Sequence, residues 1–519
     1  MILINSAAYV NAEFRNELGA IPPCFLPIGN HKLLYYQVKA LRQAFGDQEP
    51  IYLSLPEGYR LNLMEVFLIH TLSLEVIFVP EGISLGKAIT YSVTKVGIQH
   101  SPLRLLHGDT LLKQFPMEED CIALGNTQDN YEWEWSHPTE RKLAWCGYFS
   151  FSEAPQFLAA LVAKEHNFVA AVHYYAAQQA HIDYPQMNEW YDLGHINTYF
   201  RSRSAITTQR VFNTLKISQG VVWKSGVLTR KIEAEAYWLT QIPAALKRYI
   251  PQLIQTGTTS DHHFFYETEY LPLLPLNEIL VHGRNPVAFW EKLFALIGQY
   301  MSESRRLFPA QQSLERIDQD ARALYVDKTY TRLAEYAHQS HMTLDTPLHY
   351  DGKILPSLRE IAQDCIDRAL TLPVIPAICH GDLCFSNILF DSRADTIKVI
   401  DPRGLTHQQE LSIYGNQVYD LAKLHHSVIG LYDFIIADAF VIERSEDLGS
   451  TIRFTLDERL LAIQQVFLAR PFIEGIDNAQ IMAVTILLFL SMLPLHSDKP
   501  YRQEAMLLNA CRLYAQLKA

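Results

Sequence analysis

HGDLCFSNILF (residues 380–390), followed by IKVIDPRG (residues 397–404), is the most informative part of this chain. The pattern predicts a tight loop, a short apolar strand, a turn over residues 391–395 and a second strand that ends at Asp401. The first segment places a carboxylate, Asp382, and an amide, Asn387, on one loop. The predicted hairpin then returns a second carboxylate, Asp401, to the same place.

This arrangement suits phosphoryl transfer, in which catalysis consists mostly of positioning and charge neutralisation. One carboxylate would orient the attacking hydroxyl and accept its proton. The amide oxygen and the other carboxylate would hold Mg²⁺, a hard cation that prefers oxygen ligands and keeps its phosphate partners. The two segments therefore predict an enzyme that moves a phosphoryl group.

The same two segments resemble a known family. They look like the catalytic loop and the metal-binding segment of the aminoglycoside phosphotransferase and choline kinase family, whose members are relatives of protein kinases. The resemblance implies that ATP is the phosphoryl donor and that Asp382 is the catalytic base. It implies that Asn387 and Asp401 are ligands of Mg²⁺. It further implies that His380 braces the loop and that Arg403 pairs with a nearby carboxylate or phosphate.

Two predicted strands and a helix between residues 210 and 239 supply further candidates. In kinase-like folds a strand lysine and a helical glutamate together orient the ATP phosphates. Lys224 and Glu235 are the pair that we select. Glu233 and Lys216 stay open as alternatives, because the helix register decides which glutamate faces the lysine.

The predicted kinase domain spans residues 206–519. We expect an N-lobe over about residues 206–275 and a mainly helical C-lobe over about residues 276–519, which together make an α+β fold. Asp420, in the segment YDLAKL, looks like the structural aspartate that this family carries on the helix beneath the catalytic loop. We therefore expect Asp420 to brace the loop without reacting.

Residues 1–205 alternate strand-like and helix-like segments, which predicts a parallel-sheet, Rossmann-like α/β domain. The predicted strand LRLL (residues 103–106) runs directly into His107-Gly108-Asp109. An acidic residue at the carboxyl end of a parallel strand lies where such sheets bind ligands. Asp109 is therefore a candidate binding residue.

Several segments of this domain together resemble the sugar nucleotidyltransferases. They are CFLPIG (24–29) with LLYYQ (33–37), GISLGKAI (82–89), LHGD (106–109) and WYDLGHINTY (190–199). GISLGKAI is similar to the turn that contacts the base in that family, which implies that Gly86 binds a nucleotide. The family's two aspartates bind the metal that bridges the nucleotide and sugar phosphates. Here they would be Asp109 and Asp192.

The first loop departs from that family's pattern. The family has a glycine-rich loop, whose backbone N–H groups cradle a triphosphate, and then a lysine in a P-K-P motif. This chain has NSAAYVNA (residues 5–12) without glycine, and Pro22-Pro23-Cys24 where the lysine belongs. Arg15 and Lys32 are the cations that could supply the missing charge. The alternative is a domain that binds a ligand without catalysing nucleotidyl transfer.

Composition limits the class of protein. A chain of 519 residues predicts two or three domains, and 49% hydrophobic with 19% charged residues is typical of a soluble globular protein. The net charge of -12 argues against a nucleic-acid-binding protein. Seven cysteines without CxxC pairs favour reduced thiols in a cytoplasmic protein. The longest apolar run, residues 481–495, predicts a buried helix and no membrane insertion.

These observations predict a bifunctional cytoplasmic enzyme. Its kinase would phosphorylate a small sugar or polyol with ATP and Mg²⁺, and its nucleotidyltransferase would couple the product to a second nucleotide. By analogy, the activated precursor would serve bacterial capsule or other cell-surface polysaccharide. The acceptor, the nucleotide, the oligomeric state (a homo-oligomer is allowed) and the organism are left open.

Two alternatives also stay open. The first is a kinase whose N-terminal domain is a non-catalytic binding module. The second is a choline-type kinase joined to a cytidylyltransferase. Tyr131, Trp133 and Trp135 form an aromatic cluster that could be a sugar-stacking surface or, for this second alternative, a cation–π box for a choline-like head group.

Overall fold

The computed structural model describes residues 1–97, 102–131, 134–135, 142–207, 213–445 and 449–519. The chain divides into two compact units. The first unit is Met1–Thr207 together with His282–Arg284, and the second is Thr208–Val281 together with Asn285–Ala519. The assignment of separate activities to residues 1–205 and 206–519 stays a prediction.

The first unit is built on a seven-stranded sheet of order β10-β8-β9-β6-β1-β4-β5. Its strands are β1 (Ile2–Asn5), β4 (Ile51–Pro56), β5 (Glu75–Val79), β6 (Leu103–His107), β8 (Cys121–Asn126), β9 (Leu143–Phe151) and β10 (Gln186–Met187). β6, β1, β4 and β5 are parallel, whereas β9 is antiparallel to both β6 and β8. The expected α/β class is therefore confirmed. The sheet is mixed, with the predicted parallel strands side by side and β9 antiparallel to its neighbours.

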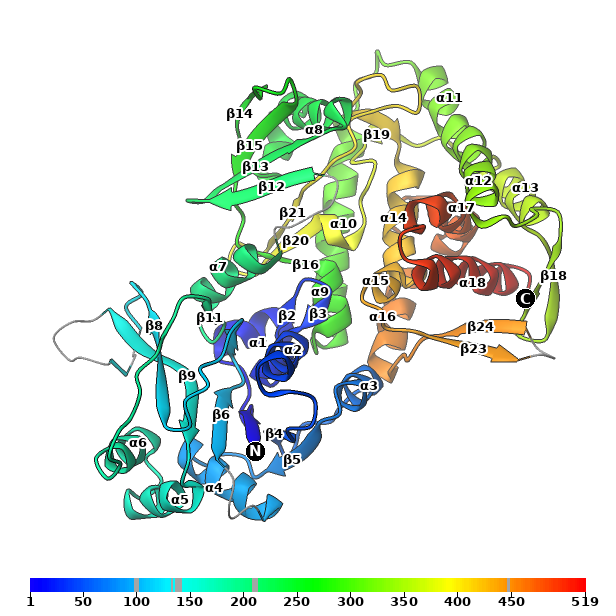
Figure 1. Ribbon diagram of the computed structural model, residues 1–519. Helices are drawn as coiled ribbons and strands as arrows, with labels where there is room; N and C mark the ends of the chain where they lie inside the picture. Colours follow the sequence, from blue (N-terminus) through cyan, green and yellow to red (C-terminus); the bar gives the residue numbers. More distant parts are fainter. Residues whose placement is uncertain (98–101, 132–133, 136–141, 208–212, 446–448) are drawn as a thin grey trace. The chain divides into compact units, whose positions relative to one another are not determined.

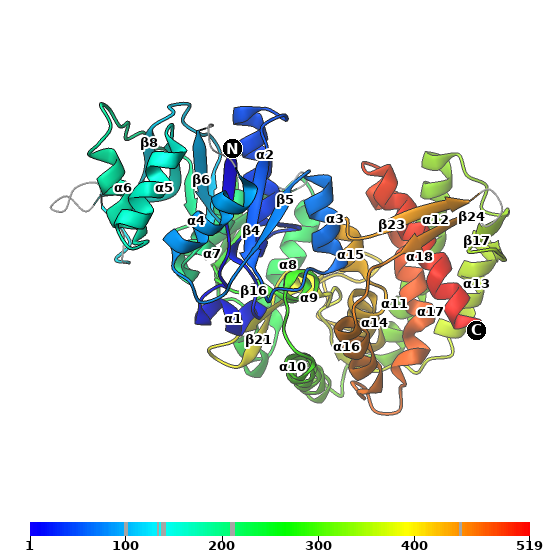
Figure 2. The ribbon, with the colours of Figure 1, turned by 90° about the horizontal axis from the view of Figure 1, so that it is seen from below.

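Strand alternation divides the core of this unit between the two faces of the sheet. Leu3 packs in one cluster, and its neighbours Ile2 and Ile4 pack in the other, as the two-residue period of a strand requires. Helices α4 (Leu85–Val96), α5 (Ala154–Ala163) and α6 (Phe168–Ala176) contribute to the first cluster, and α2 (Leu33–Phe45) and α3 (Leu63–Thr71) to the second (Figures 1 and 2). The sheet is thus buried on both faces.

Short elements complete the carboxyl edge of this sheet. β7 (Thr110–Leu112) pairs with β11 (Trp190–Asp192), and α7 (Ile196–Thr207) follows directly. Other short elements are α1 (Ala12–Leu18), η1 (Pro23–Phe25), β2 (Pro27–Ile28) and β3 (His31–Lys32). The side-chain amide of Gln37 donates to the carbonyl oxygens of His107, Gly108 and Thr110, at 3.1, 3.2 and 2.8 Å, and so fixes the strand-end loop.

The second unit begins with an antiparallel sheet of order β12-β13-β15-β14 and a helix, α8. Their bounds are β12 (Asn213–Ser218), β13 (Val221–Gly226), α8 (Thr229–Gln241), η2 (Ala244–Tyr249), β14 (Leu253–Thr258) and β15 (Phe264–Glu269). Gln219 and Gly220 both have positive φ angles, 50° and 78°, as the tight turn between β12 and β13 requires. Residues 210–212 of the first predicted strand lie outside the described residues.

The rest of the unit is mainly helical, as expected. Its helices are α9 (Leu276–His282), α10 (Val287–Arg306), α11 (Leu314–Tyr325), α12 (Asp327–Ser340), α13 (Leu358–Ala369), α14 (Gln417–Val428), α15 (Tyr432–Ile436), α16 (Glu458–Ala469), α17 (Met482–Met492) and α18 (Pro500–Leu517), with the 3₁₀ turns η3 (Phe385–Asn387), η4 (Asn478–Ile481) and η5 (Leu493–His496). Val326 is the C-cap of α11 and the N-cap of α12, so the helical run breaks between these two helices at this residue.

Short strands connect these helices. They are β16 (Leu274–Pro275), β17 (Pro347–Tyr350), β18 (Lys353–Ser357), β19 (Pro376–Ile378), β20 (Ile388–Asp391), β21 (Thr396–Val399), β22 (Tyr414–Asn416), β23 (Val441–Ser445) and β24 (Gly449–Arg453). β20 and β21 form the hairpin that the sequence predicts after the HGD loop.

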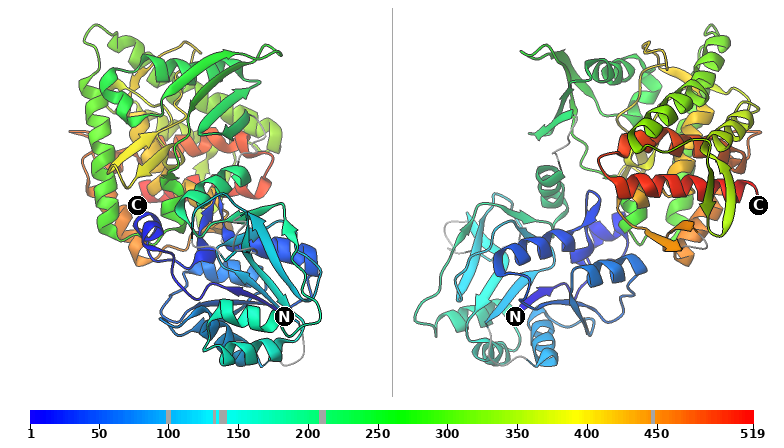
Figure 3. Two further views of the ribbon diagram at one scale, coloured as in Figure 1. Left: turned by 90° about the vertical axis from the view of Figure 1, so that its left-hand side faces the viewer. Right: turned by 45° about the vertical axis from the view of Figure 1, so that its right-hand side comes forward.

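The apolar run near the C-terminus forms the centre of the helical part. α17 packs against α12, α13, α14 and α18 (Figure 3). The segment Asn478–His496 is long and apolar enough to cross a membrane by length and composition, but 67% of its most apolar window is buried inside the fold. A buried core helix accounts for this segment.

Candidate functional site

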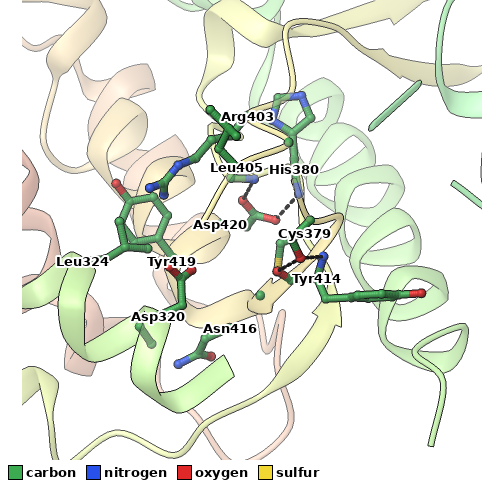
Figure 4. A pocket seen from close by; sticks show the side chains of 15 residues that line it. Asp320, Leu324, Cys379, His380, Arg403, Leu405, Tyr414, Asn416, Tyr419 and Asp420 are labelled. Carbon is green, nitrogen blue, oxygen red and sulfur yellow. Dashed lines mark hydrogen bonds between the residues drawn. The ribbon is translucent and has the colours of Figure 1, made fainter. Parts of the chain in front are cut away.

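Asp420 on α14 accepts hydrogen bonds from the backbone of the HGD loop. The carboxylate of Asp420 accepts hydrogen bonds from the backbone N–H groups of His380 (2.8 Å) and Gly381 (2.7 Å) (Figure 4). Burial raises the pKa of Asp420 to about 7, although the two N–H donors act in the opposite direction. This geometry fits the bracing role expected for Asp420.

His380 is fully buried and acts within the loop itself. Its Nε2 lies 2.9 Å from the carbonyl oxygen of Ile400, and its Nδ1 accepts from the backbone N–H of Asp382 at 3.3 Å. These contacts tie the catalytic loop to the end of β21. His380 thus links the loop that carries Asp382 to the end of β21, which fits the bracing role expected for it.

Helix α8 packs closely on the same segments. The indole of Trp238 donates to the carbonyl oxygen of Cys379 at 2.7 Å. A Cβ atom added to Gly404 would lie 2.0 Å from the carbonyl oxygen of Ala234, so only glycine allows this approach. The position of Glu235 on α8 is therefore fixed relative to the HGD and IDPRG segments.

Lys224, Glu235 and Asp401 form one cluster, in which Lys224 and Glu235 are buried and Asp401 is partly exposed. The Lys224 Nζ lies 2.6 Å from Glu235 Oε2 and 3.0 Å from Asp401 Oδ1. The hydroxyl of Tyr266 also donates to Glu235, at 2.9 Å. Burial acts to lower the pKa of Lys224, but the charges of Asp401 and Glu235 outweigh it and raise that pKa. Of the alternatives, Glu233 instead pairs with Arg230, and Lys216 lies over the ring of Trp223.

Asp382 and Asn387 lie together, as the sequence predicts. The amide nitrogen of Asn387 donates to the carbonyl oxygen (2.9 Å) and to Oδ2 (3.2 Å) of Asp382. This orientation directs the amide oxygen of Asn387 away from Asp382. Asp401 adopts a left-handed backbone, φ +57°, a strained conformation that persists where surrounding structure imposes it.

These oxygens fit a magnesium site by their chemistry. Asn387 offers an amide oxygen and Asp401 a carboxylate, and Mg²⁺ is bound in such sites through few protein oxygens, with phosphate oxygens and water completing the shell. Among the described residues, no group of three or more His, Cys, Asp or Glu side chains is arranged to hold a metal. A site of this chain would therefore depend on the nucleotide for its remaining ligands.

Lys423, which was not among the residues predicted from the sequence, forms a salt bridge with Asp382, the predicted base. The Lys423 Nζ lies 2.8 Å from Asp382 Oδ1, and its side chain is 13% exposed, against 43% for Asp382. Burial acts to raise the pKa of Asp382, but the charge of Lys423 lowers it well below its usual range. Lys423 lies three residues after Asp420 in YDLAKL, so the helical period was the signal that could have found it.

A second group of cations surrounds Tyr419, one turn before Lys423 on α14. Lys328 on α12 donates to the Tyr419 hydroxyl at 3.1 Å, and the Arg403 guanidinium lies 5.8 Å from the centre of the Tyr419 ring. Burial raises the pKa of Tyr419, yet the three nearby cations lower it to about 8. Arg403 thus faces a tyrosine, and no salt bridge of Arg403 is found among the described residues.

Arg403 and Tyr419 line a cavity of about 30 Å³ with Asp320, Leu324 and Asp420 (Figure 4). An adjoining cavity of about 390 Å³ is lined by residues of α11 and of the segment after Gly404. Asp320 borders both cavities, and its carboxylate accepts from the backbone N–H of His407 at 2.6 Å. The cavity next to the HGD loop is thus no larger than a water molecule, and the larger space lies farther out, against α11.

In the first unit, the structure brings Asp109 and Asp192 together. A Cβ atom added to Gly194 would lie 2.5 Å from Asp109 Oδ2 and 3.4 Å from Asp192 Oδ1, so both carboxylates face the same small space. Burial and the charge of Asp192 raise the pKa of Asp109 to about 6. A bound cation would relieve this repulsion, which fits the metal role predicted for the pair.

His195 completes this group. Its Nδ1 lies 2.9 Å from Asp192 Oδ2, and its ring stacks on Tyr131 with ring centres 3.8 Å apart. Trp135 forms a strand bridge with Ala144, and Trp133 lies outside the described residues. Tyr131 is therefore engaged with a histidine beside two carboxylates.

The first loop of this unit offers no triphosphate cradle. No residue of 6–11, all of them described, has a positive φ angle. The Tyr9 hydroxyl instead donates to Glu81 at 3.0 Å, and Arg15 donates to the carbonyl oxygen of Val10 at 2.9 Å. Lys32 is buried in an ion pair with Glu65, at 3.0 Å. Both cations considered as replacements for the missing lysine are thus engaged in structural contacts.

Gly86 has a packing role in α4. A Cβ atom at this position would lie 2.3 Å from the carbonyl oxygen of His166, so glycine is needed for the helix to approach that residue. The nucleotide contact proposed for Gly86 stays a prediction. Elsewhere, His425, His426 and Cys384 are buried, as expected of packing residues.

A protein-family model matches part of the second unit. Residues 222–462 match the model of the phosphotransferase enzyme family, APH. The match includes the HGD loop, the hairpin and α14, on which the site described above is built. No curated protein sequence matches the chain.

Solved structures similar to each part were also found. Aminoglycoside phosphotransferase APH(4)-Ia is 12% identical, with 60% of this chain and 92% of that chain covered and a TM-score of 0.38. A candidate glucose-1-phosphate thymidylyltransferase from Bacillus anthracis is 12% identical (40% and 96% covered, TM-score 0.32), and HddC from Yersinia pseudotuberculosis is 14% identical (40% and 99%, TM-score 0.29).

Proposed function

We propose that residues 222–462, an APH domain of the phosphotransferase enzyme family, transfer the γ-phosphoryl group of ATP to a hydroxyl of a small sugar or polyol. The single observation that carries this proposal is the Lys224–Glu235–Asp401 cluster beside the Asp382–Asn387 loop. The two segments that supply it are separated by 177 residues. In kinase-like folds a strand lysine, a helical glutamate and loop residues of this kind come together at the phosphates of ATP.

Each residue has a defined task in this proposal. Lys224, held by Glu235, would bind phosphate oxygens of the nucleotide. Asp382, kept ionised by Lys423, would orient the acceptor hydroxyl and take its proton as the oxygen attacks phosphorus. Asn387 and Asp401 would hold Mg²⁺, which supplies charge neutralisation to the transferring group. His380 and Asp420 would fix the loop that carries Asp382.

Nucleotide binding tests the proposal. We expect Mg-ATP to raise the melting temperature of the full-length protein, since a ligand at ~100 times its dissociation constant adds about 2.7 kcal/mol of stability. Asp401→Ala should abolish this rise, because it removes a metal ligand and one partner of Lys224. Lys216→Ala is the matched control and should keep it. A wild-type protein that ATP does not stabilise, or an equal rise in Asp401→Ala, would contradict the assignment.

A second candidate function is nucleotidyl transfer by the first unit, which would make the chain a bifunctional enzyme of activated-precursor supply. The convergence of Asp109 and Asp192 on one space supports it. The absence of a glycine cradle and the engagement of Lys32 by Glu65 support the alternative, a kinase with a non-catalytic binding module. A cytoplasmic location and a place in cell-surface polysaccharide synthesis are parts of the bifunctional proposal.

Asp109→Ala separates these alternatives. If the first unit is catalytic, pyrophosphate release from a nucleoside triphosphate and a sugar 1-phosphate should be lost in this variant, while kinase activity persists. The assay should cover ATP, CTP, GTP, UTP and dTTP. Absence of pyrophosphate release by the wild-type protein with every nucleotide would favour the binding module. Loss of both activities would show that the units do not act independently.

A further inference from the structure

Two cations around Tyr419, one helical turn before the lysine that contacts Asp382, have no task in the chemistry described so far. Lys328 and Arg403 both face Tyr419, a residue of α14 that is only 6% exposed. Lys423 neutralises Asp382 directly, at 2.8 Å. Neither Lys328 nor Arg403 forms a salt bridge within the part of the chain that the structure describes. The group therefore carries positive charge that the protein itself leaves uncompensated.

Lys328 and Arg403 lie where they could contact the acceptor substrate. Tyr419 and Lys423 are four residues apart on α14, so they lie on one face and about 6 Å apart along the helix axis. Asp382 contacts Lys423, and the acceptor hydroxyl must reach Asp382. The ATP phosphates, in contrast, are expected at Lys224 and Asp401, which have their own charge pairing. An acceptor bound with its reacting hydroxyl at Asp382 could therefore place a charged group, about one sugar ring away, in contact with Lys328 and Arg403.

The other groups that face this place are compatible with an anion. Lys328 is surrounded by Tyr419, Lys423 and Arg403. The one carboxylate that lines a cavity with Arg403 and Tyr419 without serving the loop is Asp320, and it accepts from the backbone N–H of His407. A cationic acceptor would have to approach three positive charges, at a cost in free energy.

We propose that the acceptor of this kinase is an anion, a hydroxyl compound that carries a phosphate or carboxylate group bound by Lys328 and Arg403. This inference depends on the proposed kinase function and narrows its substrate class. It predicts that amino sugars and quaternary amines are poor acceptors. The choline-type alternative is therefore disfavoured by the charge of the site.

A matched panel of acceptors tests the proposal with the full-length protein and Mg-ATP. Each of D-glucose, D-mannose and D-galactose is compared with its 6-phosphate, its uronic acid and its 2-amino sugar, and choline is added. ADP release and the rise in melting temperature with Mg-ADP are measured. We expect an anionic compound to exceed its neutral parent at least tenfold in kcat/KM, or to stabilise the protein when the parent does not. The phosphate and uronate arms show which anion is bound.

Variants of Lys328 assign the effect to this site. Lys328→Met keeps the apolar stem and removes the charge, and it should raise the KM of the anionic acceptor by roughly 10- to 100-fold, the worth of a charge-assisted hydrogen bond. The KM of Mg-ATP should not change. Lys328→Arg should retain most of the affinity, and Lys353→Met, an exposed lysine on β18, is the matched control.

Three results would contradict the proposal of an anionic acceptor. The inference is overturned if a neutral or amino acceptor equals the best anion, if no anionic compound surpasses its neutral parent in either assay, or if Lys328→Met raises the KM of ATP and not that of the acceptor. Stabilisation by Mg-ATP that depends on Asp401 would leave the kinase function intact in all three cases. Failure of that stabilisation would instead reject the kinase function itself.

Discussion

Asp382→Asn is expected to reduce phosphoryl transfer by about 10²- to 10⁴-fold, the usual contribution of general base catalysis. Asparagine keeps the size of the side chain and still accepts from Asn387, but it cannot take the proton of the attacking hydroxyl. Lys423 holds Asp382 in its ionised form, so the wild-type base is ready at neutral pH. The measurement is ADP release at saturating Mg-ATP.

Two controls distinguish loss of the base from loss of the folded structure. Asp382 is 43% exposed, so the variant should fold and should still be stabilised by Mg-ATP. Asp367→Asn, an exposed carboxylate on α13, should have wild-type activity. Phosphoryl transfer at a wild-type rate by Asp382→Asn would show that another group accepts the proton.

Glu65→Gln is expected to destabilise the first unit by about 3–5 kcal/mol, the cost of removing one partner from a buried ion cluster. The carboxylate of Glu65 is fully buried and accepts from Lys32 (3.0 Å), Arg284 (2.7 Å) and the Tyr59 hydroxyl (2.8 Å). Glutamine would leave two cations without a counter-charge. Thermal unfolding followed by circular dichroism measures the loss.

The pH dependence of stability provides a second readout for Glu65. Burial acts to raise the pKa of this carboxyl group, but the charges of Lys32 and Arg284 lower it below the ordinary value of 4.5. Because the pKa is lower in the folded state, the stabilisation is present at neutral pH and is lost as the pH falls below about 4.5. Glu65→Gln should therefore lose less stability on acidification than the wild type. Glu57→Gln, an exposed position before α3, is the control, and equal acid sensitivity of Glu65→Gln and wild type would contradict the prediction.

The kinase site could be predicted from sequence where its residues lie close together in the chain. Asp382, Asn387 and Asp401 fall within 20 residues, on a loop and a hairpin whose geometry follows from spacing and strand pattern. The Lys224–Glu235 pair required an assumption about helix register, and the structure places Glu235 on the lysine and Glu233 on Arg230. The periodicity of the helix alone does not decide which of the two glutamates pairs with Lys224.

Groups that depend on separate elements could not be predicted in this way. Lys328 and Tyr419 lie 91 residues apart, on α12 and α14, and they meet only because these helices pack together. Lys32 is a further example, because the sequence only allows it as one of two cations that could supply the missing charge. Glu65, 33 residues later, holds it in the core.

The sequence by itself determined the two-part architecture, the HGD loop with its hairpin, and the carboxylates at the ends of their strands. These features are local, because strand alternation, helix period and loop spacing act over a few residues. The tertiary structure alone decided which charges meet. In the kinase-like unit, Lys423 pairs with Asp382, and Lys328 and Arg403 both contact Tyr419. In the first unit, Lys32 lies in a buried ion pair, and Asp109 and Asp192 face the same small space. Charge interactions depend on distance in space and on burial, and packing sets both.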